Sequence, residues 1–324
     1  MTRMRFKFNY HILLIVLLGL ALYGNTLPNE MFWDDEDTIL NNRFIKDWRY
    51  FPRYFEENLI AGAGLVSNYW RPLLLTVFAA EWHIFGEWTP GYHIVNGSFH
   101  IADAVLLFLL LRLIFRKHLP AFLAALVFLA HPLQTEAVTM VTGLGDSLSV
   151  FFVLLGLYLY FRLPERPGLP LYAYILALMS KESAIVMPAL LFLTDLFYDF
   201  GNHKNSYDSR NHRSRILPLL PFIVIALVYI LLRATILNFS NSFNFYNGEG
   251  LFASNVLIRL LTFFRVLAQY FSLLFLPLQL HMERSVEMAL NFLSPSVIFG
   301  GLAFLSLVGL AVFSLRFLRW RTFG

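Results

Sequence analysis

Residues 92–115, YHIVNGSFHIADAVLLFLLLRLIF, combine an apolar run with a row of polar side chains. The run is long enough to cross a bilayer, which takes about 20 apolar residues. His93, Asn96, His100 and Asp103 recur at spacings of three and four residues, which places them on one side of a helix. Polar groups are costly in lipid, so this stripe predicts a bundle of membrane helices around a polar cavity. Hydrogen bonds that only hold the helices together are the alternative.

The composition of the whole chain is that of a membrane protein. Apolar residues make up 58% of the 324 residues and charged residues only 14%, against about 25% in an ordinary soluble domain. The basic residues behind the net charge of +4 lie in short segments between apolar runs. This pattern indicates membrane topology and not nucleic-acid binding. The lack of cysteine excludes disulfides and cysteine-ligated metals.

The apolar segments predict an all-α, polytopic membrane protein. Clusters of basic residues between the segments indicate the cytoplasmic side of the membrane. We interpret the basic start of the chain and the first segment as an uncleaved signal anchor. The predicted segments are 11–27, 92–115, 119–138, 146–162, 171–181, 184–199, 215–236, 256–276 and 296–316. The basic clusters are 3–7, 116–118, 162–166, 203–215 and 316–321.

Three of these segments depart from a simple crossing. Both termini fall on the cytoplasmic side by the basic-residue rule, which requires an even number of crossings. We therefore expect 256–276, which contains two arginines, to be an interfacial or re-entrant helix. The pair 171–181 and 184–199 is short for two crossings, so we expect broken or tilted helices that meet at Ser180-Lys181-Glu182.

The long loop between the first two segments, residues 28–91, is expected to face outward and is called the outer loop. It contains four consecutive acidic residues, beginning with Asp34 and Asp35. Acids at the edge of a membrane suggest a site that handles protons or a cation, and a solvated acidic loop is the alternative. The many aromatic residues and the apolar stretch 72–85 predict helices lying at the headgroup level.

Further polar residues on the expected outer side would complete a pocket. His131 and Glu136 are five residues apart with a proline between them, a spacing that argues against a metal pair. Asp146 begins the fourth segment, where it caps the helix or joins the pocket. The cations Arg71, Lys181 and His131 would hold a phosphate while an acid removes a proton from an incoming hydroxyl.

These residues belong to a series of short motifs. In order they are Trp33-Asp34-Asp35 with Ile39 and Asn42, Tyr69-Trp70-Arg71-Pro72-Leu73, Gly91-Tyr92-His93-Ile94-Val95-Asn96 with His100, His131-Pro132-Leu133-Gln134-Thr135-Glu136-Ala137-Val138, Gly145-Asp146-Ser147-Leu148, Ser180-Lys181-Glu182 with Pro188 and Asp195, Arg259-Leu260-Leu261-Thr262, and Leu276-Pro277-Leu278-Gln279-Leu280. Over about residues 30–295 the chain thereby resembles the transmembrane O-mannosyltransferases that carry tetratricopeptide repeats, a family of the GT-C superfamily.

The resemblance implies a GT-C-type helix bundle and an inverting hexosyltransferase that takes a sugar, mannose in this family, from a polyprenyl phosphate. It gives the role of catalytic base to Asp34 or Asp35 without deciding between them. The candidate substrate-binding residues are Arg71, His93, Asn96, His100, His131, Glu136, Asp146, Lys181 and Glu182. The chain departs from the family at Leu144-Gly145, where an arginine is frequent, and at His281-Met282-Glu283-Arg284, where an aspartate is usual.

Several features of the function stay open. No 34-residue repeat is recognisable in the sequence, which leaves the acceptor open between a protein Ser/Thr hydroxyl and a membrane glycan. The chemistry needs no redox cofactor, and the outer-loop acids leave Mg²⁺ or Mn²⁺ open. We expect residues 1–324 to form one domain in a prokaryotic cytoplasmic membrane, with its site facing outward. A transporter or flippase of a lipid-linked substrate and a non-catalytic membrane scaffold are the alternative functions.

Overall fold

The computed structural model of the chain describes residues 10–202, 217–239, 250–278, 280–281 and 284–321. The described part is all helical and contains no β-strand. The chain divides into two compact units, Met1–Asn241 and Ser242–Gly324. The basic clusters predicted at 3–7 and 203–215, and two residues of the motif at 281–284, lie outside the described residues. The single domain expected over 1–324 stays a prediction.

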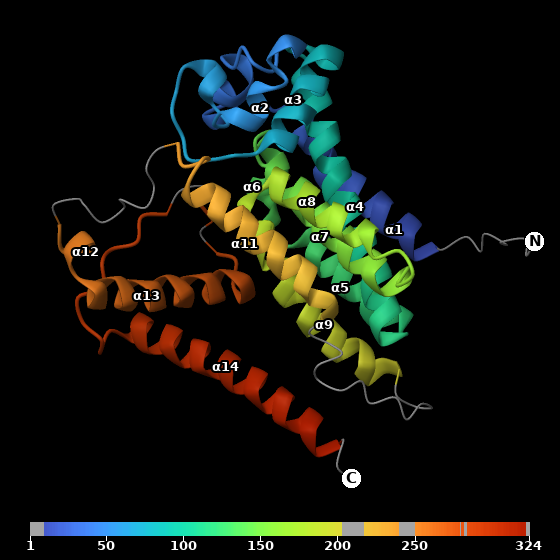
Figure 1. The fold of residues 1–324 in the computed structure, drawn as a ribbon, viewed down its shortest axis with the longest axis vertical. Coiled ribbons are helices and arrows are strands. Elements are labelled where there is room, and N and C mark those ends of the chain that lie inside the picture. Colours follow the sequence, from blue (N-terminus) through green and yellow to red (C-terminus); the bar gives the residue numbers. More distant parts are fainter. Residues whose placement is uncertain (1–9, 203–216, 240–249, 279, 282–283, 322–324) are drawn as a thin grey trace, which may run out of the picture. The chain divides into compact units, whose positions relative to one another are not determined.

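The first unit is a helix bundle with a compact outer loop beside one of its ends (Figure 1). The outer loop contains short turns of helix and α3, whereas the longer helices form the bundle. Its helices are α1 (Tyr10–Tyr23), α2 (Arg53–Glu56), α3 (Pro72–Phe85), α4 (Thr89–Phe115), α5 (His118–Ala130), α6 (Gln134–Thr139), α7 (Leu144–Arg162), α8 (Gly168–Ser180), α9 (Met187–Asn202) and α11 (Leu220–Ala234).

Helix α4 is the centre of this bundle, because α1, α5, α7 and α9 all pack against it. Glycines permit some of the close approaches between helices. Gly19 of α1 faces the Ile101 side chain on α4, and Gly156 of α7 faces Met187 at the start of α9. The buried apolar side chains form three clusters. One lies between α1, α4 and α5, one between α7, α8, α9 and α11, and one inside the outer loop.

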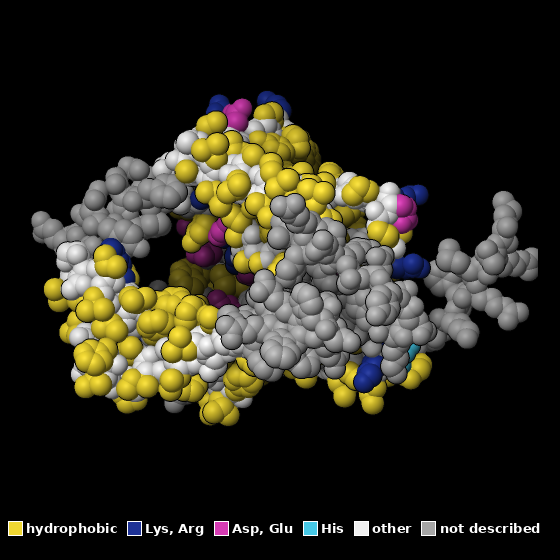
Figure 2. Space-filling view, turned by 60° about the horizontal axis from the view of Figure 1, so that its bottom comes forward, with side chains coloured by type: hydrophobic (Ala, Val, Ile, Leu, Met, Phe, Trp, Pro, Cys, Tyr) yellow, Lys and Arg dark blue, Asp and Glu magenta, His cyan; other side chains and the backbone are white. Residues whose placement is uncertain are grey.

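The structure confirms that the chain is rich in helices suited to a membrane. Four helices are long and apolar enough to cross one: Thr89–Phe115, Leu144–Arg162, Leu217–Ala234 and Val256–Phe275. Large apolar side chains are exposed along α1, α5 and α11, and hydrophobic side chains dominate the described surface in Figure 2. The range Val256–Phe275 is long enough to cross, and its predicted position at the interface stays a prediction.

One predicted segment is divided in the structure, and one predicted break is confirmed. The segment predicted at 119–138 is wrong as one helix, because α5 ends at Ala130 and α6 begins only at Gln134. The cause is Pro132, which holds the preceding His131 in an extended conformation and ends α5. The break predicted at Ser180-Lys181-Glu182 is confirmed: α8 ends at Ser180, Lys181 is extended, and a 3₁₀ turn (Glu182–Val186) precedes α9.

The second unit consists of α12 (Leu251–Ser254), α13 (Val256–Phe275) and α14 (Pro295–Arg321), with α13 packed against α14. Asn255 caps α13, since its side-chain oxygen accepts from the Leu257 and Ile258 backbone N–H groups. The Thr262 hydroxyl accepts from the Ala289 N–H at 3.0 Å and thereby fixes the connection between α13 and α14.

Two adjacent glycines of α14 test this packing. A Cβ on Gly300 would overlap the Phe264 carbonyl oxygen of α13, whereas a Cβ on Gly301 meets nothing within 4 Å. Gly300→Ala should therefore destabilise the second unit by about 1–3 kcal/mol despite the better helix propensity of alanine. Gly301→Ala is the matched control and should be neutral or stabilising. Thermal unfolding in detergent measures both, and equal effects would contradict this packing.

Candidate functional site

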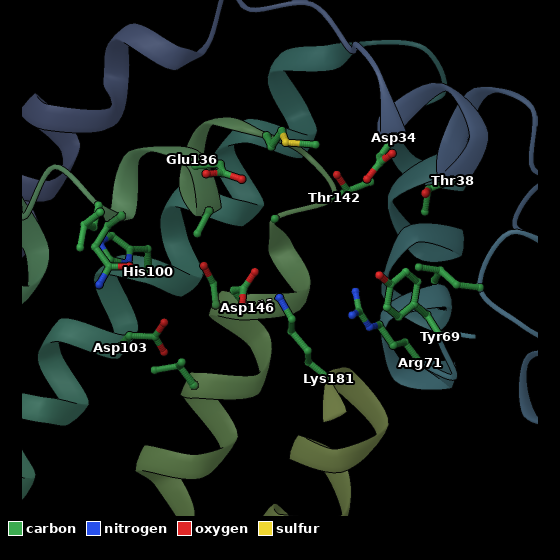
Figure 3. A pocket seen from close by; sticks show the side chains of 18 of the residues that line it. Asp34, Thr38, Tyr69, Arg71, His100, Asp103, Glu136, Thr142, Asp146 and Lys181 are labelled. Atoms are coloured by element: carbon green, nitrogen blue, oxygen red, sulfur yellow. Dashed lines mark hydrogen bonds and ion pairs between the residues drawn. The ribbon is translucent and has the colours of Figure 1, made fainter. Parts of the chain in front are cut away.

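A cavity of about 600 Å³ lies in the first unit where the outer loop meets α4, α6, α7 and the end of α8 (Figure 3). We call it the polar cavity. It brings together six of the predicted site residues, which come from five separate parts of the chain: Asp34, Arg71, His100, Glu136, Asp146 and Lys181. The other five, Asp35, His93, Asn96, His131 and Glu182, do not line it.

The two outer-loop acids have different surroundings. Asp35 is fully buried, and its Oδ1 accepts from the Thr142 N–H at 2.8 Å. This hydrogen bond fastens the outer loop to the connection between α6 and α7. Asp34 is exposed, lines the polar cavity, and makes no ion pair or side-chain hydrogen bond with another described residue. Asp34 is therefore the acid that can meet a substrate.

The backbone before these acids is unusual. Trp33 has a φ of 55°, a conformation that is rare for a bulky residue. The turn is closed by hydrogen bonds from the Asp35 N–H to the Phe32 carbonyl and from the Glu36 N–H to the Trp33 carbonyl. This turn sends Asp34 and Asp35 to different environments, although they are neighbours in the sequence.

Arg71 is the most firmly held cation of the polar cavity. Its Nε and Nη2 donate to the two carboxylate oxygens of Glu182 at 3.1 and 2.7 Å. Its guanidinium also lies over the Tyr69 ring, 4.5 Å from the ring centre. Burial alone would raise the pKa of Glu182, but the hydrogen bonds and charge of Arg71 outweigh it and lower that pKa. Glu182 thus positions Arg71 from outside the cavity.

Lys181 provides a second cation. Its Nζ donates to Asp146 Oδ1 at 2.6 Å, and in Figure 3 the lysine extends from the end of α8 towards that carboxylate at the start of α7. Glu136 of α6 also lines the cavity. Burial and the nearby charge of Asp146 raise the pKa of Glu136, and Lys181 partly offsets them. The cavity therefore contains both cations and carboxylates.

Gly145 lies close to Arg71 and to the end of α8. A Cβ built on it would be 3.8 Å from Arg71 Nη1 and 3.8 Å from the carbonyl oxygen of Ser180, the residue before Lys181. The similar family often has an arginine in this element, and here the guanidinium next to it comes from Arg71. The tightest contact of that Cβ would be with Leu74 Cδ2 at 3.1 Å, so the missing side chain leaves room for Leu74 of α3 beside the start of α7.

The polar stripe of α4 has two roles. Asn96 Nδ2 donates to the carbonyls of Ala137, Val138 and Met140 at 3.1, 3.1 and 2.8 Å. Its Oδ1 accepts from the Ser147 hydroxyl at 3.2 Å. His93 Nε2 is 3.2 Å from the Asn29 carbonyl oxygen. Neither His93 nor Asn96 lines the polar cavity, and their hydrogen bonds join α4 to neighbouring segments of the fold.

The deeper part of the stripe lines the polar cavity. His100 Nε2 lies 3.3 Å from the Leu129 carbonyl oxygen and 3.4 Å from the Tyr23 hydroxyl. Asp103 is buried, and neither carboxylate oxygen has a hydrogen-bond partner among the described residues. His131 lies outside the cavity, and its Nδ1 accepts from the Leu133 N–H at 3.2 Å. Thr38, Tyr69 and Thr142 also line the cavity, although none of them was among the predicted site residues.

An apolar groove of about 560 Å³ adjoins the polar cavity. It lies between α4, α7, the 3₁₀ turn after Lys181, and α9. Val150 of α7 lines both, so the two are neighbours at that residue. No group of three or more His, Asp or Glu side chains that could hold a metal ion occurs in the described part of the chain.

The chain is similar to several known proteins that are named protein O-mannosyl-transferase. Protein O-mannosyl-transferase tmtc2 of Xenopus laevis is 31% identical over 200 residues, which is 57% of this chain and 24% of the relative. Protein O-mannosyl-transferase Tmtc1 of Drosophila melanogaster is 31% identical over 198 residues, 58% and 23% of the two chains. Human Protein O-mannosyl-transferase TMTC2 is 33% identical over 150 residues, 45% and 18% of the two chains.

The chain is a distant homologue of the TMTC protein O-mannosyl-transferases. The match spans about a quarter of the length of these curated relatives. No protein-family profile and no solved structure matches the chain. The distant relation to the TMTC family nevertheless agrees with the resemblance that the motifs carry.

The different surroundings of Asp34 and Asp35 lead to a stability test. Asp35→Ala leaves the Thr142 N–H without its acceptor and should destabilise the first unit by about 1–3 kcal/mol. Asp34→Ala removes no hydrogen bond between described residues and should leave stability unchanged within about 0.5 kcal/mol. Thermal unfolding of the two variants beside the wild type checks this, and a larger loss for Asp34→Ala would be contrary to the assignment.

The Arg71–Glu182 pair predicts a pH dependence. Since the pKa of Glu182 is lowered by folding, the stability that this carboxylate contributes is present above its ordinary pKa of 4.5 and is lost as pH falls through the lowered value. The melting temperature of wild type should exceed that of Glu182→Gln at pH 7, and the difference should shrink below about pH 4.5. A difference that stays constant down to pH 3 would show that the carboxylate charge is irrelevant.

Proposed function

We propose that this chain is a membrane-embedded, inverting glycosyltransferase that transfers a sugar from a polyprenyl phosphate to a hydroxyl acceptor. The observation that carries the proposal is the polar cavity, where the free carboxylate of Asp34 shares one space with the cations Arg71 and Lys181. The names of the relatives support mannose as the sugar and a protein as the acceptor.

The cations supply the first half of the chemistry. The donor phosphate binds beside Arg71 and Lys181, whose charges stabilise the negative charge that develops as the bond between the sugar and the phosphate breaks. Glu182 holds the Arg71 guanidinium in a fixed orientation through two hydrogen bonds. Such fixed donors stabilise developing charge without having to rearrange during the reaction.

Asp34 supplies the second half. It accepts the proton of the acceptor hydroxyl while the hydroxyl oxygen attacks the anomeric carbon from the side opposite the phosphate. A new carbon–oxygen bond forms, the bond to the phosphate breaks, and the polyprenyl phosphate leaves with the electron pair. The anomeric configuration inverts, and the proton ends on Asp34.

The apolar groove fits the lipid part of the donor. A polyprenyl chain needs an apolar surface that begins where its phosphate is bound. The groove meets the polar cavity at Val150 and is lined by Leu, Ile, Val and Phe side chains of α4, α7 and α9. This proximity supports a lipid-linked donor over a soluble sugar nucleotide, which has no long apolar part to bind.

The test of the base compares two acids of the same loop. Purified protein in detergent is given a labelled polyprenyl-phosphate mannose with peptide and membrane-glycan acceptors. Asp34→Asn should lower the transfer rate about 10²- to 10⁴-fold, as expected for loss of a general base, while donor binding persists. Glu36→Gln is the matched control, because Glu36 is exposed and does not line the polar cavity.

Equal activity of wild type and Asp34→Asn would reject Asp34 as the base. Transport of the labelled donor across vesicles without sugar transfer would instead establish the transporter alternative.

The cations are tested by binding. Lys181→Met should weaken donor binding about tenfold, because a charge-assisted bond to the phosphate is worth roughly 1.5–3 kcal/mol. Arg71→Lys should also weaken donor binding, since a lysine ammonium cannot form the two parallel hydrogen bonds of a guanidinium. Both variants should leave acceptor binding unchanged, measured by titration of fluorescent analogues. Weakened acceptor binding with normal donor binding would overturn this division of roles.

A further inference from the structure

The first unit has a second charged cavity, at the opposite end of α4 from the outer loop. Its volume is about 320 Å³, and we call it the basic cavity. It shares no lining residue with the polar cavity. Its polar lining residues come from α4, α5, α7 and α9 and are Arg112, Arg116, His118, Tyr158, Arg162 and Tyr198.

Three arginines converge on this cavity. Arg112 lies in the last turn of α4, Arg116 follows that helix directly, and Arg162 ends α7. None of the three side chains makes an ion pair or hydrogen bond with another described residue, although the Arg112 guanidinium lies 5.5 Å from the centre of the Phe108 ring. Among the described side chains that line the basic cavity there is no carboxylate. Like charges gathered in this way repel one another, and a bound anion would relieve the repulsion.

Arg116 has a backbone conformation that adds to this arrangement. It ends α4 with a φ of 54°, in the left-handed region where glycine is usual. The left-handed residue reverses the chain so that α5 begins at His118, two residues later. Arg112, Arg116 and His118 thus reach one cavity from two consecutive helices.

The positive-inside rule accounts for basic residues on the cytoplasmic side of the bundle, but not for their convergence. Basic residues that only set topology can point in any direction into water. Lys117 and Arg166 are examples, since neither lines the basic cavity, although Arg116 and Arg162 are exposed like them. The convergence of three arginines from two helices is the observation that requires a ligand.

We propose that the basic cavity binds the phosphate of an anionic lipid headgroup from the cytoplasmic leaflet. Guanidinium groups match the geometry of phosphate oxygens, and basic pockets between membrane helices suit anionic headgroups. Leu109 and Leu113 add apolar surface to the cavity, which an acyl-glycerol group can cover and an inorganic phosphate cannot. Tyr158 and Tyr198 combine an apolar ring with a polar hydroxyl, as suits the level of the headgroups.

The experiment measures lipid binding by the purified full-length chain after removal of native lipid. Phosphatidylglycerol in mixed micelles should raise the melting temperature in a saturable manner, whereas phosphatidylcholine at the same mole fraction should not. Inorganic phosphate at the same concentration should neither raise it nor compete. Equal stabilisation by phosphatidylcholine would overturn the headgroup assignment, and equal stabilisation by inorganic phosphate would replace the lipid with a free anion.

Two single variants test the site itself. Arg162→Gln should weaken the apparent affinity for phosphatidylglycerol about fivefold, the usual effect of one basic residue at an anionic membrane surface. Arg112→Gln should act in the same direction and guards against a local folding defect at residue 162. Arg166→Gln removes the same charge four residues away but outside the cavity, and should change the affinity less than twofold. Equal losses for Arg162→Gln and Arg166→Gln would mean a diffuse surface charge and would reject the site.

Discussion

The hydrogen bonds from Asn96 to the carbonyls of Ala137, Val138 and Met140 hold the irregular backbone on which the polar cavity depends. Backbone carbonyls that leave a helix near lipid need partners, because the bilayer interior supplies none. One amide on α4 satisfies three of them and accepts from Ser147 on α7. The connection between α6 and α7 is thereby fixed, and it presents Glu136, Thr142 and Asp146 to the same space.

The same connection also positions the outer loop. The Thr142 N–H donates to Asp35 from this connection, so the loop that carries Asp34 is fastened to the bundle at one defined point. Asn96 therefore supports Asp34 indirectly, through Thr142 and Asp35, although it does not line the polar cavity. Residues that never meet a substrate can thus decide where the exposed acid lies.

Local sequence signals were sufficient to predict most of the helices and one irregular feature. The break at Lys181 follows from the length of the two flanking apolar runs, which are too short for separate crossings. The predicted bounds 119–138 ran past the end of α5 because the apolar run continues beyond Pro132, although the proline between His131 and Glu136 marks the break. Spacing on α4 correctly placed His93, Asn96, His100 and Asp103 on one stripe, but it did not show which of them face a cavity.

The division between Asp34 and Asp35 was beyond the sequence. Both are acidic, adjacent and equally close to the first apolar run. The difference arises from a hydrogen bond between residues 107 positions apart and from the unusual conformation of Trp33. Long-range contacts of this kind leave no local pattern. The ion pair of Arg71 with Glu182, 111 positions apart, is a second example.

The two cations of the polar cavity are held with different strength, and this difference bears on how a phosphate would bind. The Arg71 side chain is 11% exposed and has two hydrogen bonds to one carboxylate, so removing Glu182 leaves a nearly buried charge unpaired. The pair of Lys181 with Asp146 is more open, with exposed fractions of 24% and 46%, and pairs of this kind contribute only about 0–1 kcal/mol.

If a phosphate oxygen replaces Asp146 as the partner of Lys181, little stabilising free energy is therefore lost. Arg71, in contrast, keeps the position in which Glu182 holds it. One cation is fixed and the other is free to follow the phosphate as its bond to the sugar breaks. In the proposed reaction, such an arrangement would orient the donor through Arg71 and let Lys181 remain with the leaving group.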